Sequence, residues 1–168
     1  MNIVLIGYRG SGKSTVGRKL ASALWMEFVD TDTLLTDRAG KSIKEIFAAE
    51  GEAGFRDREA AVIQEVAGRD NHVIAAGGGA VLRAENVAAL KKNGKVIWLQ
   101  ASPDALWRRI QADEASIDSR PNLTVGGIEE IKTILEARTP VYEGAADAKL
   151  DVTYLDPDRA VEYLTKML

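Results

Sequence analysis

A glycine-rich segment near the start of the chain is the first group of residues that could do chemistry. Residues 7–15 read Gly-Tyr-Arg-Gly-Ser-Gly-Lys-Ser-Thr and match the pattern Gly-x-x-x-x-Gly-Lys-[Ser/Thr]. In such a loop the backbone N–H groups surround phosphates, the lysine reaches the β and γ phosphates, and the next hydroxyl ligates Mg²⁺. Lys13 and Ser14 occupy these two positions. A glycine-rich turn without a ligand is the weaker interpretation, because an apolar run precedes the motif and a helical pattern follows it. The segment therefore predicts a nucleoside triphosphate site.

Two carboxylates follow the second apolar run, in the sequence Asp30-Thr31-Asp32. Ligands of parallel α/β sheets bind at the carboxyl ends of the strands. Residues i and i+2 of an extended segment face the same side, so we expect both carboxylates to face one pocket. One would hold Mg²⁺ through its water shell, and the other would accept a proton from an acceptor hydroxyl. A solvated acidic turn is the alternative, and the neighbouring phosphate loop argues against it.

Three consecutive glycines, Gly77 to Gly79, follow the third apolar run. Their cost in backbone entropy is explained if the main chain approaches a ligand closely, although a tight turn would also explain them. No aspartate ends this run, which leaves Asp30 as the carboxylate near the metal. The arginines are spread along the chain, and only motif context can assign them a role.

The elements that must position these residues follow the pattern of an α/β protein. Short apolar runs alternate with longer segments of helical period, which is typical of a mostly parallel sheet. The predicted strands are residues 3–6, 27–30, 72–75, 95–99 and 150–153. The predicted helices are residues 13–24, 42–49, 52–67, 84–93, 103–113, 128–141 and 158–168. Between the last two strands, residues 114–127 are polar and indicate either a surface loop or a mobile lid.

Length and composition narrow the class of protein. The 168 residues are 46% hydrophobic and carry a formal net charge of −3, which suits one domain (residues 1–168) without a basic surface. We therefore expect no nucleic-acid and no membrane partner. The chain has no cysteine, which excludes disulfides and thiolate metal sites. Without a membrane span or a secretory signal, a cytoplasmic protein is expected, and we expect a monomer.

The remaining aromatic and imidazole side chains are expected to be structural. His72, the single histidine, stands at the start of a predicted strand. Trp25, Trp98 and Trp107 are expected to pack in the interior rather than to stack on a ligand.

Taken together, the motifs resemble those of shikimate kinase over essentially the full length of the chain. Beside the phosphate loop and the aspartate pair, they are Gly-Glu-Ala-Gly-Phe-Arg-Asp-Arg-Glu at 51–59, Gly-Gly-Gly-Ala-Val at 77–81, Arg-Pro at 120–121 and Arg-Thr-Pro-Val-Tyr at 138–142. Many nucleotide-binding families share the loop, whereas the combination is far more specific. The resemblance implies ATP-dependent phosphorylation of the 3-hydroxyl of shikimate, a step toward chorismate and the aromatic amino acids.

The resemblance also implies a fold. It is a five-stranded parallel sheet with helices on both faces, of the nucleoside-monophosphate-kinase type. A mobile lid is expected at about 114–127, and a substrate-binding helical region at about 33–62. After Arg120-Pro121 many members carry Leu-Leu, whereas this chain has Asn122-Leu123, a difference that bears on how the lid packs.

Residue roles follow from the same resemblance. The ATP phosphates would be held by Gly10, Ser11, Gly12, Lys13, Ser14 and Thr15. Arg120 would reach the phosphates from the lid, and Arg109 would lie near adenine. Shikimate would be bound by Asp32, Arg56, Gly78 and Arg138. Ser14 would ligate Mg²⁺ directly and Asp30 through water, while Lys13, Asp32 and Arg120 would be catalytic.

Two other functions stay open on the sequence. Another small-molecule or nucleoside-monophosphate kinase would share the scaffold, but a mononucleotide kinase must also bind a base at the acceptor site. A non-catalytic nucleotide-binding module would have no need of a proton acceptor such as Asp32. Release of ADP with shikimate, compared across a panel of acceptors, separates the three functions.

Overall fold

The structure is a computed structural model that describes residues 1–113 and 127–168. The expected lid lies outside the described residues except for Gly127, and so do Arg120, Pro121 and Asn122.

Five parallel strands form one sheet in the order β2-β3-β1-β4-β5. They are β1 (Asn2–Ile6), β2 (Glu27–Asp30), β3 (His72–Ala75), β4 (Gly94–Gln100) and β5 (Ala148–Asp151). The runs of β1, β3 and β4 are almost continuously apolar because both faces of the sheet are covered. The prediction of a five-stranded parallel sheet is confirmed. The last strand begins two residues before its predicted start, because β5 is an edge strand whose residues alternate in exposure and carry little apolar signal.

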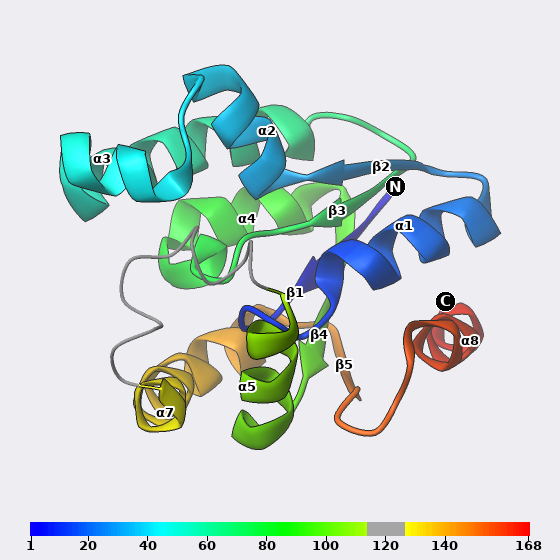
Figure 1. Ribbon diagram of the computed structural model, residues 1–168. Helices are drawn as coiled ribbons and strands as arrows, with labels where there is room; N and C mark the ends of the chain where they lie inside the picture. The colour runs from blue at the N-terminus through cyan, green and yellow to red at the C-terminus, as the bar shows by residue number, and fades with distance from the viewer. Residues whose placement is uncertain (114–126) are drawn as a thin grey trace.

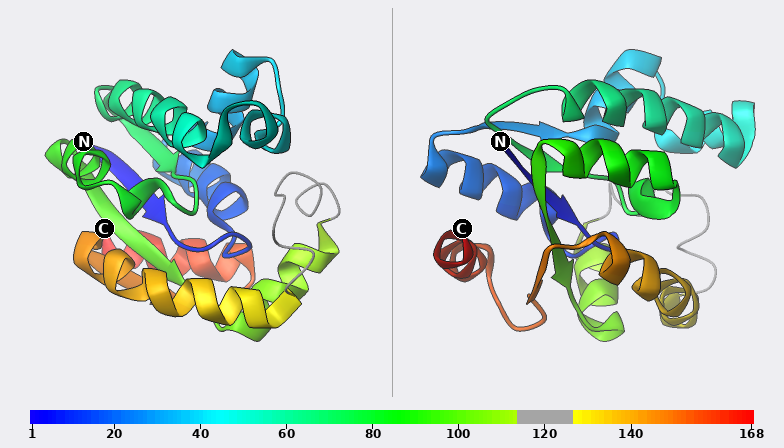
Figure 2. Two further views of the ribbon diagram at one scale, coloured as in Figure 1. Left: turned by 90° about the vertical axis from the view of Figure 1, so that its left-hand side faces the viewer. Right: turned by 180° about the vertical axis from the view of Figure 1, so that it is seen from behind.

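Helices cover both faces of this sheet (Figures 1 and 2). They are α1 (Lys13–Leu24), α2 (Thr31–Ala39), α3 (Ile43–Ala67), α4 (Ala84–Lys92), α5 (Pro103–Ala112), α7 (Gly127–Ala145) and α8 (Pro157–Met167), with a short 3-10 helix η1 (Ala80–Leu82). Caps fix several of the starts: Ser42 and Glu45 form a capping box at α3, while Ser102 and Asp156 cap α5 and α8.

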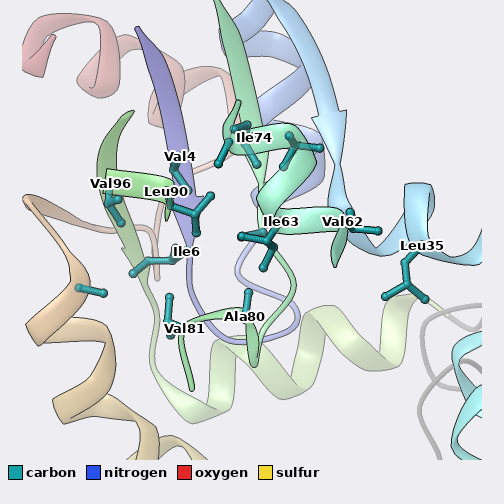
Figure 3. Close-up of a cluster of buried hydrophobic side chains, with 14 of the residues drawn as sticks. Val4, Ile6, Leu35, Val62, Ile63, Ile74, Ala80, Val81, Leu90 and Val96 are labelled. Atoms are coloured by element: carbon teal, nitrogen blue, oxygen red, sulfur yellow. The ribbon is translucent and has the colours of Figure 1, made fainter. Parts of the chain in front are cut away.

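The strand pleat divides the apolar core into two layers. Val4 and Ile6 of β1 belong to one layer, together with Ile63 of α3 and Leu90 of α4 (Figure 3). Alternate side chains of β1 belong to the second layer, which contains residues of α1, α5 and α8. Because both layers use the same central strand, the loop that follows β1 is anchored on both faces of the sheet.

Helix α3 consists of two helical halves that meet at a kink, in agreement with the two helices predicted at 42–49 and 52–67. The kink lies at Gly51, where φ is 71° and ψ is −177°, a backbone conformation that favours glycine. Across this kink the rings of Phe47 and Phe55 lie 4.9 Å apart, and Arg58 bonds to Glu50 at 3.0 Å. These contacts hold the half of α3 that carries Arg56 in a fixed relation to the other half.

The residue pattern does not predict helix α2, although most of it falls within the helical region at about 33–62 that the resemblance implies. An ion pair at the surface joins it to α3. Arg38 donates hydrogen bonds to both carboxylate oxygens of Glu65. These bonds, with a further one from Arg69, lower the pKa of the Glu65 carboxyl to about 2. Exposed pairs contribute little to stability, so α2 relies mainly on burial of residues such as Leu35.

One expectation about the tryptophans is wrong. Trp25 ends α1 in a left-handed conformation, with φ of 56°, and its side chain is 92% exposed. Its position one residue beyond the helix turns the ring out to the surface. Trp98 is buried and Trp107 packs partly buried against the second layer, as expected. No helix among the described residues is both long and apolar enough to cross a membrane.

Candidate active site

A cavity of about 410 Å³ lies where the strand order reverses, at the carboxyl ends of β1, β2 and β3. This volume is typical of small-molecule sites. Pairing between β1 and β3 continues to the rim of the cavity, where Ala76 N–H donates to the Leu5 carbonyl at 3.0 Å. The predicted site residues that line the cavity are Gly10, Gly12, Lys13, Ser14, Thr15, Asp30, Asp32, Gly78 and Arg109. Ser11 lines an adjoining cavity of about 330 Å³ that shares Gly10, Gly12, Thr15 and Arg109 with the first.

The phosphate loop ends on a helix whose N-terminus carries no side-chain cap. Gly12 occupies the cap position of α1 with φ of 93°, and the first turn has no acidic residue. By contrast, α2, α3, α5 and α8 each have both a side-chain cap and an acidic first turn. The free N–H groups and the positive end of the α1 dipole are thus available for an anion. Lys13 bridges the loop, with Nζ 2.7 Å from the Gly7 carbonyl and 3.1 Å from the Tyr8 carbonyl.

Ser14 and Asp30 meet beside this loop. The Ser14 hydroxyl donates a hydrogen bond to the Asp30 carboxylate, whose other oxygen accepts from Thr33 N–H at 3.0 Å and caps α2. No group of three or more His, Cys, Asp or Glu residues in the described ranges could hold a metal alone. One hydroxyl and one carboxylate fit Mg²⁺, which binds few protein oxygens and takes its remaining ligands from water and phosphates.

The two aspartates reach the cavity for a different reason from the one predicted. Asp30 ends β2 in an extended conformation, but α2 begins at Thr31, so Asp32 lies in the first turn of a helix. The argument from alternating positions of a strand is therefore wrong. Both side chains nevertheless line the same cavity, because the helix starts immediately at the end of the strand. The positive end of α2 also favours a carboxylate at Asp32.

The three glycines after β3 are where residues distant in sequence converge. A Cβ at Gly77 would lie 2.6 Å from Asp32 Oδ1, and one at Gly78 would lie 3.7 Å from Arg138 Nη1. A Cβ at Gly79 would collide with the Arg56 guanidinium. Successive positions of one turn thus contact an aspartate and two arginines. The turn also meets the phosphate loop, since the Gly78 position is 3.5 Å from Arg9 N.

Arg56 and Arg138 approach this turn without being part of the cavity lining. Arg56 is buried, with Nη1 2.8 Å from Glu59 and Nε 3.7 Å from Glu52. Neighbouring carboxylates on α3 therefore fix the direction of its guanidinium. A planar carboxylic acid near the glycines would find two forked donors, which is the arrangement that suits bidentate recognition.

Arg109 connects the two adjoining cavities. Its Nη2 donates a hydrogen bond to the Val152 carbonyl at 2.6 Å. Arg109 also lines both cavities. Burial, followed by repulsion from Arg108, lowers the pKa of Arg109 from its ordinary value, although Asp151 opposes this shift. A guanidinium is not deprotonated in proteins at neutral pH, so Arg109 stays cationic.

Several contributors were missed or underused in the sequence analysis. Arg9 and Asp113 line the cavity, but Arg9 occupies a variable position of the motif and Asp113 is an ordinary helix-end residue by pattern. Tyr142 donates a hydrogen bond to the Gly78 carbonyl at 2.7 Å, whereas the sequence identified it only as the last residue of the motif at 138–142 and predicted no contact for it. His72 begins β3 and contacts the Asp70 carbonyl at 2.7 Å, in accord with a structural role.

Comparison with known proteins agrees with this geometry. The family model for shikimate kinase matches residues 9–168. A shikimate kinase of Rhodopirellula baltica is 43% identical over 168 residues, which span 99% of this chain and 88% of the relative. One from Symbiobacterium thermophilum is 48% identical over 151 residues, or 89% of this chain and 86% of that protein. The structure of shikimate kinase from Acinetobacter baumannii in complex with shikimate matches with a TM-score of 0.93 at 34% identity, covering 99% of this chain and 91% of that one. The chain belongs to the shikimate kinase family.

Proposed function

We propose that this protein transfers the γ-phosphoryl group of ATP to the 3-hydroxyl of shikimate, releasing ADP, on the route to chorismate and the aromatic amino acids. The observation that carries the proposal is the glycine turn, which brings Asp32, Arg138 and Arg56 together directly beside the phosphate loop. A triphosphate in the loop and a hydroxy acid at the turn would then be neighbours. The monomeric state, the single-domain organisation and the cytoplasmic location stay predictions.

In this proposal each residue has one task. The loop and the uncapped start of α1 hold the phosphates, and Lys13 neutralises charge on the moving phosphoryl group. Arg56 and Arg138 hold the substrate carboxylate. Asp32 orients the acceptor hydroxyl and takes its proton as the new P–O bond forms and the bond to the ADP oxygen breaks. Arg120, which lies outside the described residues, would add positive charge from the lid.

Mg²⁺ belongs to the same proposal. Ser14 and Asp30 would hold it, directly and through water, because their oxygens already lie together at the cavity. When bound, the ion would neutralise negative charge on the β and γ phosphates. The hydrogen bond from the Ser14 hydroxyl to the Asp30 carboxylate keeps the two groups beside each other.

The activity is tested by measuring ADP release with shikimate, with related hydroxy acids and polyols, and with nucleoside monophosphates. We expect shikimate alone to support rapid turnover, with phosphate on the 3-hydroxyl of the product. Turnover confined to a nucleoside monophosphate would assign the chain to a different kinase reaction. Tight ATP binding without transfer to any acceptor would indicate a non-catalytic module.

Arg56→Lys tests the carboxylate clamp. Lysine keeps the charge but loses the planar fork, so we expect KM for shikimate to rise about tenfold or more, corresponding to about 1.4 kcal/mol, while KM for ATP stays nearly constant. Arg159→Lys is the matched control, because Arg159 is an exposed arginine of α8 that pairs with Glu162 and lines neither cavity of the site. Equal weakening of both substrates in Arg56→Lys would contradict the clamp.

A further inference from the structure

Tyr142 is a fully buried residue of α7 that touches the glycine turn. Its hydroxyl donates a hydrogen bond to the Gly78 carbonyl at 2.7 Å, and its ring stacks on Trp98 of β4 with centroids 5.5 Å apart. Both Tyr142 and Gly78 are buried, so water does not compete for this bond. A buried hydroxyl and a buried carbonyl each need a partner, and here each supplies the other.

The same helix face carries Arg138. Residues 138 and 142 are one helical turn apart, so their side chains lie on one side of α7, and both meet Gly78. Between them stands Pro140, which has no N–H to donate to the preceding turn. The segment that presents Arg138 is therefore short of one backbone hydrogen bond. The contact of Tyr142 with Gly78 and Trp98 supplies an anchor from outside the helix.

The glycine turn is fixed from its other side as well. Gly77 N–H donates to the buried Thr31 hydroxyl at 3.0 Å, and the Gly77 and Gly79 carbonyls accept from Ala80 and Leu82. The Gly78 carbonyl is the one in the turn that takes its bond from α7. Because a peptide unit is planar and trans, pinning this carbonyl also fixes the direction of the Gly79 N–H, which points the opposite way.

We propose that Tyr142 is a positioning residue for the acceptor acid, which holds the Gly78–Gly79 peptide and the Arg138 guanidinium in the orientation that binds the substrate carboxylate. This inference rests on the proposed shikimate kinase activity. Tyr142 itself lies behind the turn and is not part of the cavity lining. We expect its effect mainly at the acceptor site, because Tyr142 bonds to the glycine turn, whereas the phosphate loop is built on β1 and α1.

Tyr142→Phe is the direct test, since it removes one oxygen and keeps the stacked ring. We expect KM for shikimate to rise about tenfold, with kcat and KM for ATP nearly unchanged, because the buried Gly78 carbonyl loses its partner and the Gly78–Gly79 peptide is held less firmly. Thr139→Val is the matched control: it removes a hydroxyl that bonds the Leu135 carbonyl within the same helix. We expect this control variant to have the wild-type KM for both shikimate and ATP.

The outcomes separate positioning from general stability. The proposal is wrong if a folded Tyr142→Phe protein keeps the wild-type KM for shikimate. It is also wrong if kcat falls and the KM values for shikimate and ATP both rise. If Tyr142→Phe does not fold, Trp98→Phe is the deciding variant, because it weakens the stacking that holds the Tyr142 ring. We expect a folded Trp98→Phe protein to have a raised KM for shikimate and an unchanged KM for ATP. A folded protein without this change would overturn the proposal. Failure of the wild-type protein to phosphorylate shikimate would instead refute the proposed function, so the two failures are distinguishable.

Discussion

Lys13→Met is expected to abolish phosphoryl transfer while leaving the protein folded. Lys13 Nζ lies at the mouth of the phosphate loop, bonded to the Gly7 and Tyr8 carbonyls. Methionine matches the aliphatic stem but removes the charge that stabilises the transferring phosphoryl group. Loss of a single such donor costs about 10²–10³ in kcat, and the loss of a full charge should cost at least as much. Steady-state ADP release with saturating shikimate measures the effect.

Lys19→Met is the control for that experiment. Lys19 lies on the same helix, α1, but pairs with Asp158 at 3.0 Å and is about half exposed. Removing its charge should therefore leave kcat unchanged. A Lys13→Met protein that retained near-normal turnover, with the thermal midpoint of both variants close to wild type, would remove Lys13 from the chemistry.

The parts of the site that the sequence predicted well are the local ones. The phosphate loop is contiguous, so its residue types and the glycines that permit its turns can be seen together in nine positions. Strands β1 and β3 are buried on both faces of the sheet, and their almost continuous apolar runs predict this burial. For these elements, local pattern and tertiary environment agree.

Elements stabilised mainly by tertiary contacts could not be predicted in the same way. Helix α2 has a weak apolar pattern, and it depends on a cap from Asp30 and on packing against α3. Its absence from the pattern-based prediction led to the wrong geometric reason for the placement of Asp32. The exposure of Trp25 likewise follows from a left-handed residue at a helix end, which no periodicity reports.

Contacts between distant segments form the third class. The sequence indicated that Gly77 to Gly79 approach something closely, but not what they approach. In the structure the groups that these glycines approach are carboxylates and guanidinium groups from α2, α3 and α7. Only the resemblance to a family, through the segments at 51–59 and 138–142, joined these residues before the fold was known.

Asp32→Asn is expected to lower kcat by about 10²–10⁴-fold, which is the usual contribution of a positioned general base. The amide has the same shape and can still hydrogen-bond the acceptor hydroxyl, but it cannot take its proton. We therefore expect KM for shikimate to change much less than kcat. The close approach of Gly77 to Asp32 Oδ1, where a Cβ would lie at 2.6 Å, leaves the side chain little freedom to turn away.

Asp37→Asn provides the comparison, because Asp37 is an exposed carboxylate on the same helix. It lines a neighbouring cavity that also contains Asp32, but not the cavity that Lys13 and Ser14 line. Its kcat should equal that of the wild type. If Asp32→Asn also turned over at the wild-type rate, proton removal would not need this carboxylate. Asp32 would then act only in binding, and a raised KM for shikimate would be its sole signature.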